Sequence, residues 1–393
     1  MKYITRTIWI LSLISLFTDI ASEMLYPVMP IYLKSIGFSI VLIGFLEGLA
    51  EAVAGLSKGY FGKLSDNTGK RVPFIRLGYA FSTISKPMMA IFIYPAWIFL
   101  ARTIDRFGKG IRTGARDAML SDESTAATKG KVFGFHRGMD TLGAVLGPLS
   151  ALIYLYFFPD HYQTLFYIAF LPGVCAVLAS FLLKDKKTKP VNKSVSTPFF
   201  SFIDYWKTSP ALYRRVVIGL LFFTLFNSSD VFLLLKLKQS GLSDPMVIGV
   251  YIFYNLVYAI AAFPVGVIAD KIGLKKTFIS GLILFTIVYA GMSMNNNLSV
   301  YLLLFSIYGL FAAATDGISK AWISNISDKK DTATAIGFFT GFQSICTLLA
   351  SSLAGLIWYR YGAVATFTIT STATTLAVIY LLIATPDPVP GKN

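Results

Sequence analysis

Long apolar segments alternate with short polar ones along the whole chain. A helix needs about 20 mostly apolar residues to cross the hydrocarbon core of a bilayer. Twelve segments meet this length if a few charges in each are tolerated, and the segment at 95–116 carries the most charge. We predict membrane-spanning helices at 8–33, 39–61, 73–93, 95–116, 131–157, 162–183, 213–238, 245–269, 275–294, 298–324, 333–359 and 362–384.

The only long polar stretch, 185–212, falls halfway along the series of apolar segments. It divides the chain into residues 1–184, with six predicted spans, and residues 213–393, with six more. We therefore expect an all-α membrane protein with twelve transmembrane helices arranged as two pseudo-symmetric six-helix bundles. The stretch between them is expected to be a cytoplasmic linker with a short surface helix at 199–208.

A short basic turn occurs once in each half, 204 residues apart. The pattern Gly-x3-Asp-x2-Gly followed by basic residues is found at 62–71 and again at 266–276. A second match relates the small residues spaced by four at 130–138 to those at 333–341. Internal repeats of this kind are frequent in secondary transporters, which bind their substrate near the bilayer midplane between the repeats.

Composition supports a membrane protein and explains the large positive charge. The 393 residues are 55% hydrophobic and 14% charged, whereas a soluble protein carries about 25% charged residues. The net charge of +15 could suggest nucleic acid. However, with the N-terminus inside, 24 of the 35 Lys and Arg residues fall on the cytoplasmic side and four outside. This asymmetry follows the positive-inside rule, so we expect both termini in the cytoplasm, contact with anionic lipid and no nucleic-acid partner.

The start of the chain is expected to be a retained first span of a multi-pass protein of the cytoplasmic (inner) membrane. Cleavable signal peptides have an apolar core of about 7–15 residues. The first apolar stretch here is longer than that and lacks a small-x-small cleavage site.

The turn at 62–71 resembles the signature of the major facilitator superfamily between its second and third spans, and 266–276 stands where that family has a degenerate copy. The resemblance covers essentially the whole chain. In span four, Arg106-x3-Gly110 is similar to the arginine motif of the family, with more charged neighbours than usual.

Span five resembles the motif of the proton-driven efflux antiporters within that superfamily. Gly143-x3-Gly147-Pro148 matches it, whereas Ser150 and Ala151 replace the glycine pair that usually follows. Glycines spaced by four residues let helices pack closely, and a proline inside a helix removes one backbone hydrogen bond. These residues are expected to serve packing at least as much as transport.

The resemblance implies a gate at Asp66. In the family, this aspartate accepts hydrogen bonds from a helix N-terminus and pairs with basic groups when the cytoplasmic side is closed, and an anion is stabilised at that positive end of a helix. The alternative is a basic loop that only sets topology. The residues expected to act in gating are Gly62, Asp66, Gly69, Arg71, Gly143, Gly147, Pro148 and Asp270.

Ionisable residues within membrane spans are functional candidates because they are costly to insert. Asp19 with Glu23, and Glu47 with Glu51, are spaced i,i+4 and so share one helical face. Repulsion within such a pair favours a proton on one member. The alternative is that acids and bases neutralise one another, for example Asp105 with Arg102 or Arg106. The candidates for proton coupling are Asp19, Glu23, Glu47, Glu51, Asp105 and Asp140.

Candidate substrate contacts combine a basic stripe in the first half with polar residues of the second half. Arginine binds carboxylate and phosphate well, so the stripe could hold an anionic cargo, with Lys320 as a partner from the second half. The candidates for substrate binding are Arg102, Arg106, Lys109, His136, Arg137, Tyr26, Asp230, Tyr254, Asp316 and Lys320.

These observations favour a secondary active transporter that works by alternating access, with proton-coupled efflux of a small organic molecule as the first hypothesis. Proton-coupled transport of an anionic carboxylate or phosphate compound is the alternative. A metal-ion exporter, based on His136 and Asp140 at i,i+4 spacing, stays open, as do a lipid flippase and a sensor. No nucleophile–base arrangement is present, so no enzyme and no cofactor are expected. We expect a monomer in the bilayer.

Overall fold

The computed structural model describes residues 4–26, 28–29, 32–33, 36–38, 40–159, 161–185, 198–294 and 297–385. The side chains of residues 40–52, 244–245 and 248 lie outside the description. In the described part of the chain every regular element is helical, which confirms the predicted all-α class. The first half contains α1 (Arg6–Leu25), α3 (Ile40–Thr68), α4 (Val72–Ile91), α5 (Pro95–Asp122), α6 (Lys129–Phe157) and α7 (Tyr162–Ser180).

The second half begins with a short 3-10 helix and continues with longer helices. These elements are η1 (Phe199–Asp204), α8 (Tyr205–Thr208), α9 (Ala211–Phe226), α10 (Val231–Gln239), α11 (Asp244–Ile272), α12 (Leu274–Met294), α13 (Leu298–Ile326), η2 (Lys329–Asp331) and α14 (Thr332–Ala384).

The chain forms two compact units. Unit 1 comprises residues 1–125, 136–205 and 328–344, and unit 2 comprises residues 126–135, 206–327 and 345–393. The start of α14 therefore belongs to unit 1, and the start of α6 belongs to unit 2. The division into bundles at residues 1–184 and 213–393 remains a prediction.

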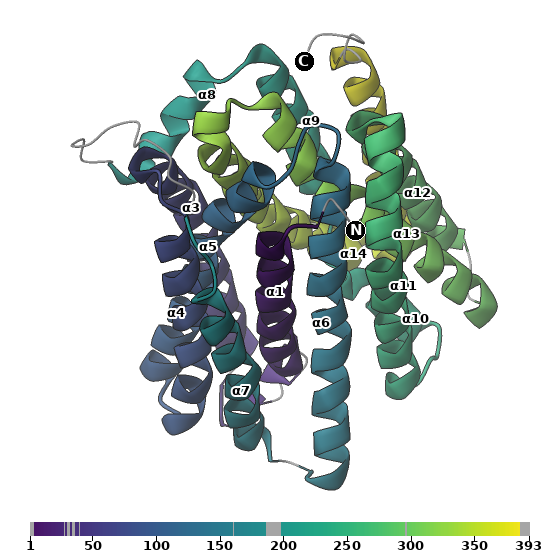
Figure 1. The fold of residues 1–393 in the computed structure, drawn as a ribbon. Helices are drawn as coiled ribbons and strands as arrows, with labels where there is room; N and C mark the ends of the chain where they lie inside the picture. The colour runs from purple at the N-terminus through teal and green to yellow at the C-terminus, as the bar shows by residue number, and fades with distance from the viewer. Residues whose placement is uncertain are drawn as a thin grey trace. The chain divides into compact units, whose positions relative to one another are not determined.

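Close helix packing in unit 1 depends on small residues. Helix α4 packs against α5 and α7 (Figure 1). A Cβ atom added to Gly78 of α4 would lie 2.6 Å from the carbonyl oxygen of Gly108 of α5, and the reverse distance is the same. The backbones of α4 and α5 approach this closely only because neither residue has a side chain.

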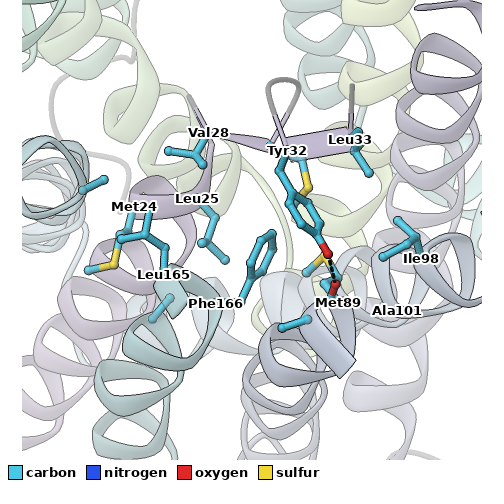
Figure 2. Close-up of a cluster of buried hydrophobic side chains, with 14 of the residues drawn as sticks. Met24, Leu25, Val28, Tyr32, Leu33, Met89, Ile98, Ala101, Leu165 and Phe166 are labelled. Atoms are coloured by element: carbon cyan, nitrogen blue, oxygen red, sulfur yellow. Dashed lines mark hydrogen bonds between the residues drawn. The ribbon is translucent and has the colours of Figure 1, made fainter. Parts of the chain in front are cut away.

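An apolar cluster surrounds the C-terminal end of α1 in unit 1 (Figure 2). The ring of Tyr32 lies 4.9 Å from that of Phe166, and its hydroxyl donates to the carbonyl oxygen of Met89 at 3.1 Å. The cluster holds together α1, α4, α5 and α7, because it also includes Leu25 and Ile98. It fixes one end of the helices that carry the charged residues described below.

Aromatic side chains fill the interior of unit 2, where α13 packs against α11 and α12. The rings of Phe285 and Tyr289 stack with their centroids 4.1 Å apart, and Phe311 lies 4.8 Å from Phe285. Gly281 of α12 allows α13 to approach closely, since a Cβ atom at this residue would lie 2.8 Å from the side chain of Thr315.

The helices agree with the predicted spans in most places. Eight helical segments of the described chain are long and apolar enough to cross a membrane, including one that covers α14. Within α14, Gly362 has a φ of 81°, and this left-handed residue separates the predicted spans eleven and twelve. The charged α5 is not among the eight segments, yet it is a continuous helix, as the prediction for 95–116 requires.

Two predicted spans differ from the structure. Span seven was expected to be one helix over 213–238, but α9 ends at Phe226 and α10 begins at Val231. The polar sequence Asn227–Asp230 breaks the helix, because Asn, Ser and Asp side chains compete with the backbone for hydrogen bonds. Helix α1 ends at Leu25, before the expected end at residue 33, and the two prolines expected to bend that region, at 27 and 30, lie outside the described residues.

The linker helix expected at 199–208 is confirmed as η1 followed by α8, but it is not merely a surface element. The ring of Phe202 is 2% exposed and packs over Gly59 of α3, where even a Cβ atom would collide with it. Lys63 also donates to the carbonyl oxygen of Ser201 at 2.5 Å. The linker is thus anchored to α3 within unit 1.

Candidate functional site

A carboxyl group of α6, Asp140, is the centre of the main polar cluster in unit 1. Ser15 of α1 donates a hydrogen bond to Asp140 Oδ1 at 2.7 Å, and Arg137 forms an ion pair with Oδ2. Arg116 of α5 donates to Ser15 Oγ at 3.4 Å. Three helices therefore meet at one buried acid.

The Asp19 carboxyl group of α1 interacts electrostatically with Asp140. A Cβ atom added to Gly143 of α6 would lie 2.8 Å from the Cβ atom of Asp19, so the two helices are in close contact here. Two neighbouring carboxyl groups repel each other when both are ionised. The pair predicted from sequence was Asp19 with Glu23, and the structure adds Asp140 from another helix.

The second acid of α1, Glu23, faces the basic stripe of α5. It interacts electrostatically with Lys109 and Arg106, and also with Asp140. Glu23 and Arg106 are half-buried and Lys109 is exposed. The structure therefore brings together three of the predicted proton-coupling acids with three of the predicted substrate-binding bases, Arg106, Lys109 and Arg137.

A separate ion cluster joins α4 to α5. Lys86 Nζ lies 3.0 Å from Asp105 Oδ1, and Arg102 Nη1 lies 3.4 Å from Oδ2. Lys86 also donates to Ser22 Oγ of α1 at 3.2 Å, and Ser85 donates to Asp105. The predicted neutralisation of Asp105 by Arg102 is confirmed. Sequence reasoning missed Lys86, although a lone lysine in the apolar stretch 73–93 was a visible signal.

The inner part of α5 carries two more arginines that are almost fully buried. Arg112 donates to Ser82 Oγ at 2.5 Å and lies over the ring of Tyr79, with 4.5 Å from Cζ to the ring centroid. Arg116 pairs with Asp117 at 2.8 Å, a contact also missed from sequence. Both residues lie in the predicted span 95–116, and α5 continues beyond them to residue 122 and buries both side chains.

The glycines of α6 allow α1 to approach it. A Cβ atom added to Gly143 would lie 2.6 Å from the Leu16 carbonyl oxygen, and one on Gly147 would lie 2.7 Å from the Met24 nitrogen. Pro148 follows within the continuous helix. These contacts keep Asp19 and Asp140 next to each other, so the glycines have a packing role in the charged cluster.

The Asp66 carboxylate, at the end of α3, binds the N-terminus of α14 within unit 1. It accepts hydrogen bonds from the backbone N–H groups of Ala333 at 3.3 Å and Thr334 at 2.6 Å, and from the Thr334 hydroxyl at 2.7 Å. Arg71 pairs with it at 2.5 Å. Burial raises the pKa of Asp66, and Arg71 and Thr334 oppose that rise.

The turn glycines have the conformations that the gate requires. Gly69 has a φ of 64°, in the left-handed region that glycine adopts at little cost. A Cβ atom on Gly62 would collide with the carbonyl oxygen of Ala333. The sequence repeat therefore places both glycines and the acid in one tight helix contact.

Asp270 makes the corresponding contact in unit 2. It accepts hydrogen bonds from the N–H groups of Gly130 at 2.7 Å and Lys131 at 2.9 Å, at the N-terminus of α6. A Cβ atom on Gly266 would collide with the Gly130 carbonyl oxygen. Each copy of the repeated turn thus caps the first turn of a helix with a carboxylate.

Asp230 is the central polar residue of unit 2, at the helix break between α9 and α10. Its two carboxylate oxygens accept hydrogen bonds from the hydroxyls of Tyr308 and Tyr254, both at 2.5 Å. Asp316 of α13 accepts from Tyr258 at 2.7 Å and interacts electrostatically with Asp230. Of these, Tyr254, Asp230 and Asp316 were predicted from sequence, and Tyr308 and Tyr258 were not.

Among the remaining predicted residues, His136 interacts electrostatically with Asp140. Lys320 is half-buried on α13, one turn after Asp316, and His136 is 4% exposed on α6. Tyr26 is 49% exposed at the end of α1. The side chains of Glu47 and Glu51 lie outside the described residues. Within the described chain, no group of three or more His, Cys, Asp or Glu residues could hold a metal ion.

The helical fold, the apolar spans and the polar clusters inside them define a multi-pass membrane transporter rather than an enzyme. The sequence model of the Major Facilitator Superfamily matches residues 11–254 and 237–393. The chain belongs to this superfamily, whose members bind small-molecule substrates in a membrane.

Two relatives and one solved structure illustrate the breadth of the similarity. An uncharacterised MFS-type transporter of Methanocaldococcus jannaschii is 30% identical over 378 residues, covering 92% of this chain and 93% of that protein. The quinolone resistance protein NorA of Staphylococcus aureus is 27% identical over 122 residues, or 31% of each chain. The human organic anion transporter MFSD10 has the same fold, with a TM-score of 0.77 and 17% identity, over 96% of this chain and 99% of that one.

Proposed function

We propose that this chain exports a small organic molecule in exchange for protons. The observation that carries the proposal is the carboxyl pair of Asp19 and Asp140 on two helices of unit 1. Such a pair holds one proton and releases it when the surroundings supply another positive charge. Arg137 and the basic residues of α5 supply this positive charge if a bound cargo displaces them from Asp140 and Glu23.

Coupling requires that cargo and proton exclude each other. Loss of the proton from Asp19 leaves two adjacent negative charges, which a cargo or a rearranged Arg137 must balance. Glu23 interacts electrostatically with Arg106, Lys109 and Asp140. A cargo bound to these bases therefore changes the charge beside the Asp19 and Asp140 carboxyl groups. Binding and protonation are then linked through one cluster.

The two carboxylate caps provide the switch in this proposal. Asp66 binds the N-terminus of α14, and Asp270 binds the N-terminus of α6. In this proposal the hydrogen bonds of each cap form together and break together. Residues 1–184 and 213–393 would move as the two bodies around the linker 185–212. We also propose that the protein acts as a monomer in the inner membrane, with both termini in the cytoplasm, as the distribution of basic residues favours.

The similarity to an efflux protein supports the proposed direction. The quinolone resistance protein is similar over 122 residues, and Gly143, Gly147 and Pro148 resemble the motif of such antiporters. The substrate of that relative says nothing specific about the cargo of this chain.

A second candidate is the transport of an organic anion. Besides Arg76, seven basic residues lie on α4, α5 and α6 of unit 1, and three of these, Arg106, Lys109 and Arg137, are not fully buried. The human organic anion transporter has the same fold. Competition by carboxylates and phosphates for the bound cargo would favour this candidate, and cargo that is cationic or neutral would exclude it. The seven residues are Lys86, Arg102, Arg106, Lys109, Arg112, Arg116 and Arg137.

Proton flux in liposomes tests the main proposal. A thermal-shift screen of the purified protein at two pH values first identifies a cargo. The protein is then reconstituted with an internal pH dye, and cargo is added under an imposed pH gradient. Asp19→Asn is expected to abolish proton-linked flux while leaving exchange between two pools of cargo. The matched control is Asp204→Asn, which removes an exposed carboxylate of the linker helix.

Unchanged proton flux in both Asp19→Asn and Asp140→Asn would overturn the proposal. The same assay applies to Glu47→Gln and Glu51→Gln, the acids of α3 that were predicted from sequence. If only these two variants lose proton-linked flux, the proton site is on α3 and the carboxyl pair is structural.

A further inference from the structure

The helix break in unit 2 contains an acid with an unusual set of partners. Asp230 is held by two tyrosine hydroxyls, each donating to a different carboxylate oxygen at 2.5 Å. Within the described residues no basic side chain pairs with it, and the nearby charged group that acts on it is another acid, Asp316. Buried charges in proteins are normally paired, so this carboxylate lacks a positive counterpart.

The same break contains further oxygen atoms without hydrogen-bond partners. Asn227 Oδ1, Ser228 Oγ and Tyr289 Oη are buried and form no hydrogen bond within the part of the chain that the structure describes. The hydroxyls of Ser228 and Tyr289 are close enough to interact with each other, which still leaves hydrogen-bonding capacity on both, and Tyr289 also interacts electrostatically with Asp230. Ser228 is 4% exposed and Tyr289 is fully buried. Unsatisfied buried oxygens of this kind call for a ligand, an ion or a water molecule.

The backbone at this point is also of the type found at ion sites. Helix α9 ends at Phe226 and α10 begins at Val231, inside the predicted span 213–238. Irregular backbone at membrane depth is tolerated where it is buried in protein or lines a water-filled cavity. In secondary transporters, the C-terminal ends of such half-helices, which are the negative ends of their dipoles, coordinate cations.

We propose that the break at Asn227–Asp230 is a binding site for a monovalent cation. Asp230 supplies the single negative charge, and the oxygens of Asn227, Ser228 and Tyr289 supply neutral ligands. Hard cations prefer oxygen ligands of this kind. Each Asp230 oxygen keeps a further lone pair after accepting its tyrosine hydroxyl. A single carboxylate balances one positive charge, whereas a divalent metal ion is normally bound by more than one carboxylate.

Tyr254 and Tyr308 act as positioning residues in this site. Their hydroxyls orient the carboxylate from α11 and α13, while Asp230 itself lies at the start of α10. The cation is either an alkali-metal ion or the ammonium group of a bound cargo, since both present one positive charge to oxygen ligands. The site is separate from the carboxyl pair of Asp19 and Asp140 and does not depend on the proposed proton exchange.

Thermal stability of the purified full-length protein in detergent provides the test. Melting temperatures are compared in sodium, potassium and methylammonium chloride against choline chloride at equal ionic strength. A rise with sodium or potassium identifies an alkali-metal site, and a rise with methylammonium alone identifies an ammonium site. Either rise supports the proposal if Asp230→Asn abolishes it. For Tyr308→Phe we expect about tenfold weaker cation affinity, as for other residues that orient a ligand.

Two controls keep the test independent of the proposed antiport. Asp19→Asn is expected to retain the cation response, even if its proton flux is lost, and Asp204→Asn is expected to behave as wild type. The proposal is overturned if none of the three cations stabilises the wild-type protein more than choline does. It is also overturned if Asp230→Asn responds to them as the wild type does.

Discussion

The two units hold their buried acids in different ways. In unit 1, Asp105 and Asp140 are neutralised by basic side chains from their own and neighbouring helices. In unit 2, Asp230 and Asp316 accept hydrogen bonds from tyrosine hydroxyls on α11 and α13. The two repeats therefore share the carboxylate caps at Asp66 and Asp270 and differ in the chemistry of their interiors.

This difference suggests separate roles for the two units, proton exchange in unit 1 and cation binding in unit 2. An ion network can take up or release a proton with compensation by a neighbouring base, as Asp19 and Asp140 can with Arg137. The two tyrosine hydroxyls that bind Asp230 leave a lone pair on each of its oxygens for a cation. We therefore propose proton handling in unit 1 and cation binding in unit 2, each with its own test.

The largest effect in this comparison is expected at Lys86. Lys86→Met removes one partner of the buried pair with Asp105, and breaking such a pair costs about 3–5 kcal/mol. The melting temperature in detergent should fall accordingly. In the double variant Lys86→Met/Asp105→Leu both charges are gone, so most of the stability should return. If the single variant is as stable as wild type, the ion network is not structural.

The next largest effect is expected from the glycines at the two gates. Gly62→Ala and Gly266→Ala place a methyl group against the carbonyl oxygens of Ala333 and Gly130, and overpacking of this kind costs about 1–3 kcal/mol. Both should lower the melting temperature and impair transport. Gly249→Ala on the same helix as Gly266 meets no atom within 4 Å, and it should be neutral or stabilising. A similar loss in all three variants would point to a general helix effect.

The two carboxylate caps should differ in strength. Asp66 binds two N–H groups, a hydroxyl and Arg71, whereas Asp270 binds two N–H groups. Each hydrogen bond to a charged group contributes about 1.5–3 kcal/mol. Asp66→Asn should therefore reduce the transport rate more than Asp270→Asn, with cargo affinity unchanged in both. Weaker cargo binding at a normal transport rate would contradict a gating role.

The smallest effect is expected in unit 2. Tyr254→Phe deletes one hydroxyl donor to Asp230 and should cost about 1.5 kcal/mol, the low end for a hydrogen bond to a charged group, because Tyr308 still binds the carboxylate. The control is Tyr359→Phe, at a tyrosine that is 91% exposed and should have no effect on stability. A loss as large as that of Lys86→Met would mean that the hydroxyl network is as important to folding as the ion network.

Much of the architecture could be predicted from the sequence. The spacing of apolar segments identified the helices, and the resemblance of the repeated turn to the superfamily signature indicated the acids of both carboxylate caps, whose partners at Thr334 and Gly130 lie far along the chain. The break in span seven was missed, since Asn227–Asp230 is too short to lower the hydropathy of a whole span. The residues for these caps were correctly chosen, while their role in gating stays a prediction.

The pairing of charges was the least predictable part. Spacing along one helix relates residues that are three or four positions apart, so it linked Asp105 to Arg102 or Arg106 only as a possibility. It gave no means of relating Lys86 on α4 to Asp105 on α5. The same limit hid the two tyrosines that bind Asp230 from different helices.

The sequence alone determined the membrane class, the number of spans, their duplication and the family, because the hydrocarbon core imposes a length and a polarity on every segment that crosses it. Tertiary structure alone decided which acid meets which base or hydroxyl. That outcome depends on the rotation and close approach of neighbouring helices, which glycines such as Gly78 and Gly143 permit. A linear pattern of residues does not specify these rotations, since they are settled only when all the side chains pack together.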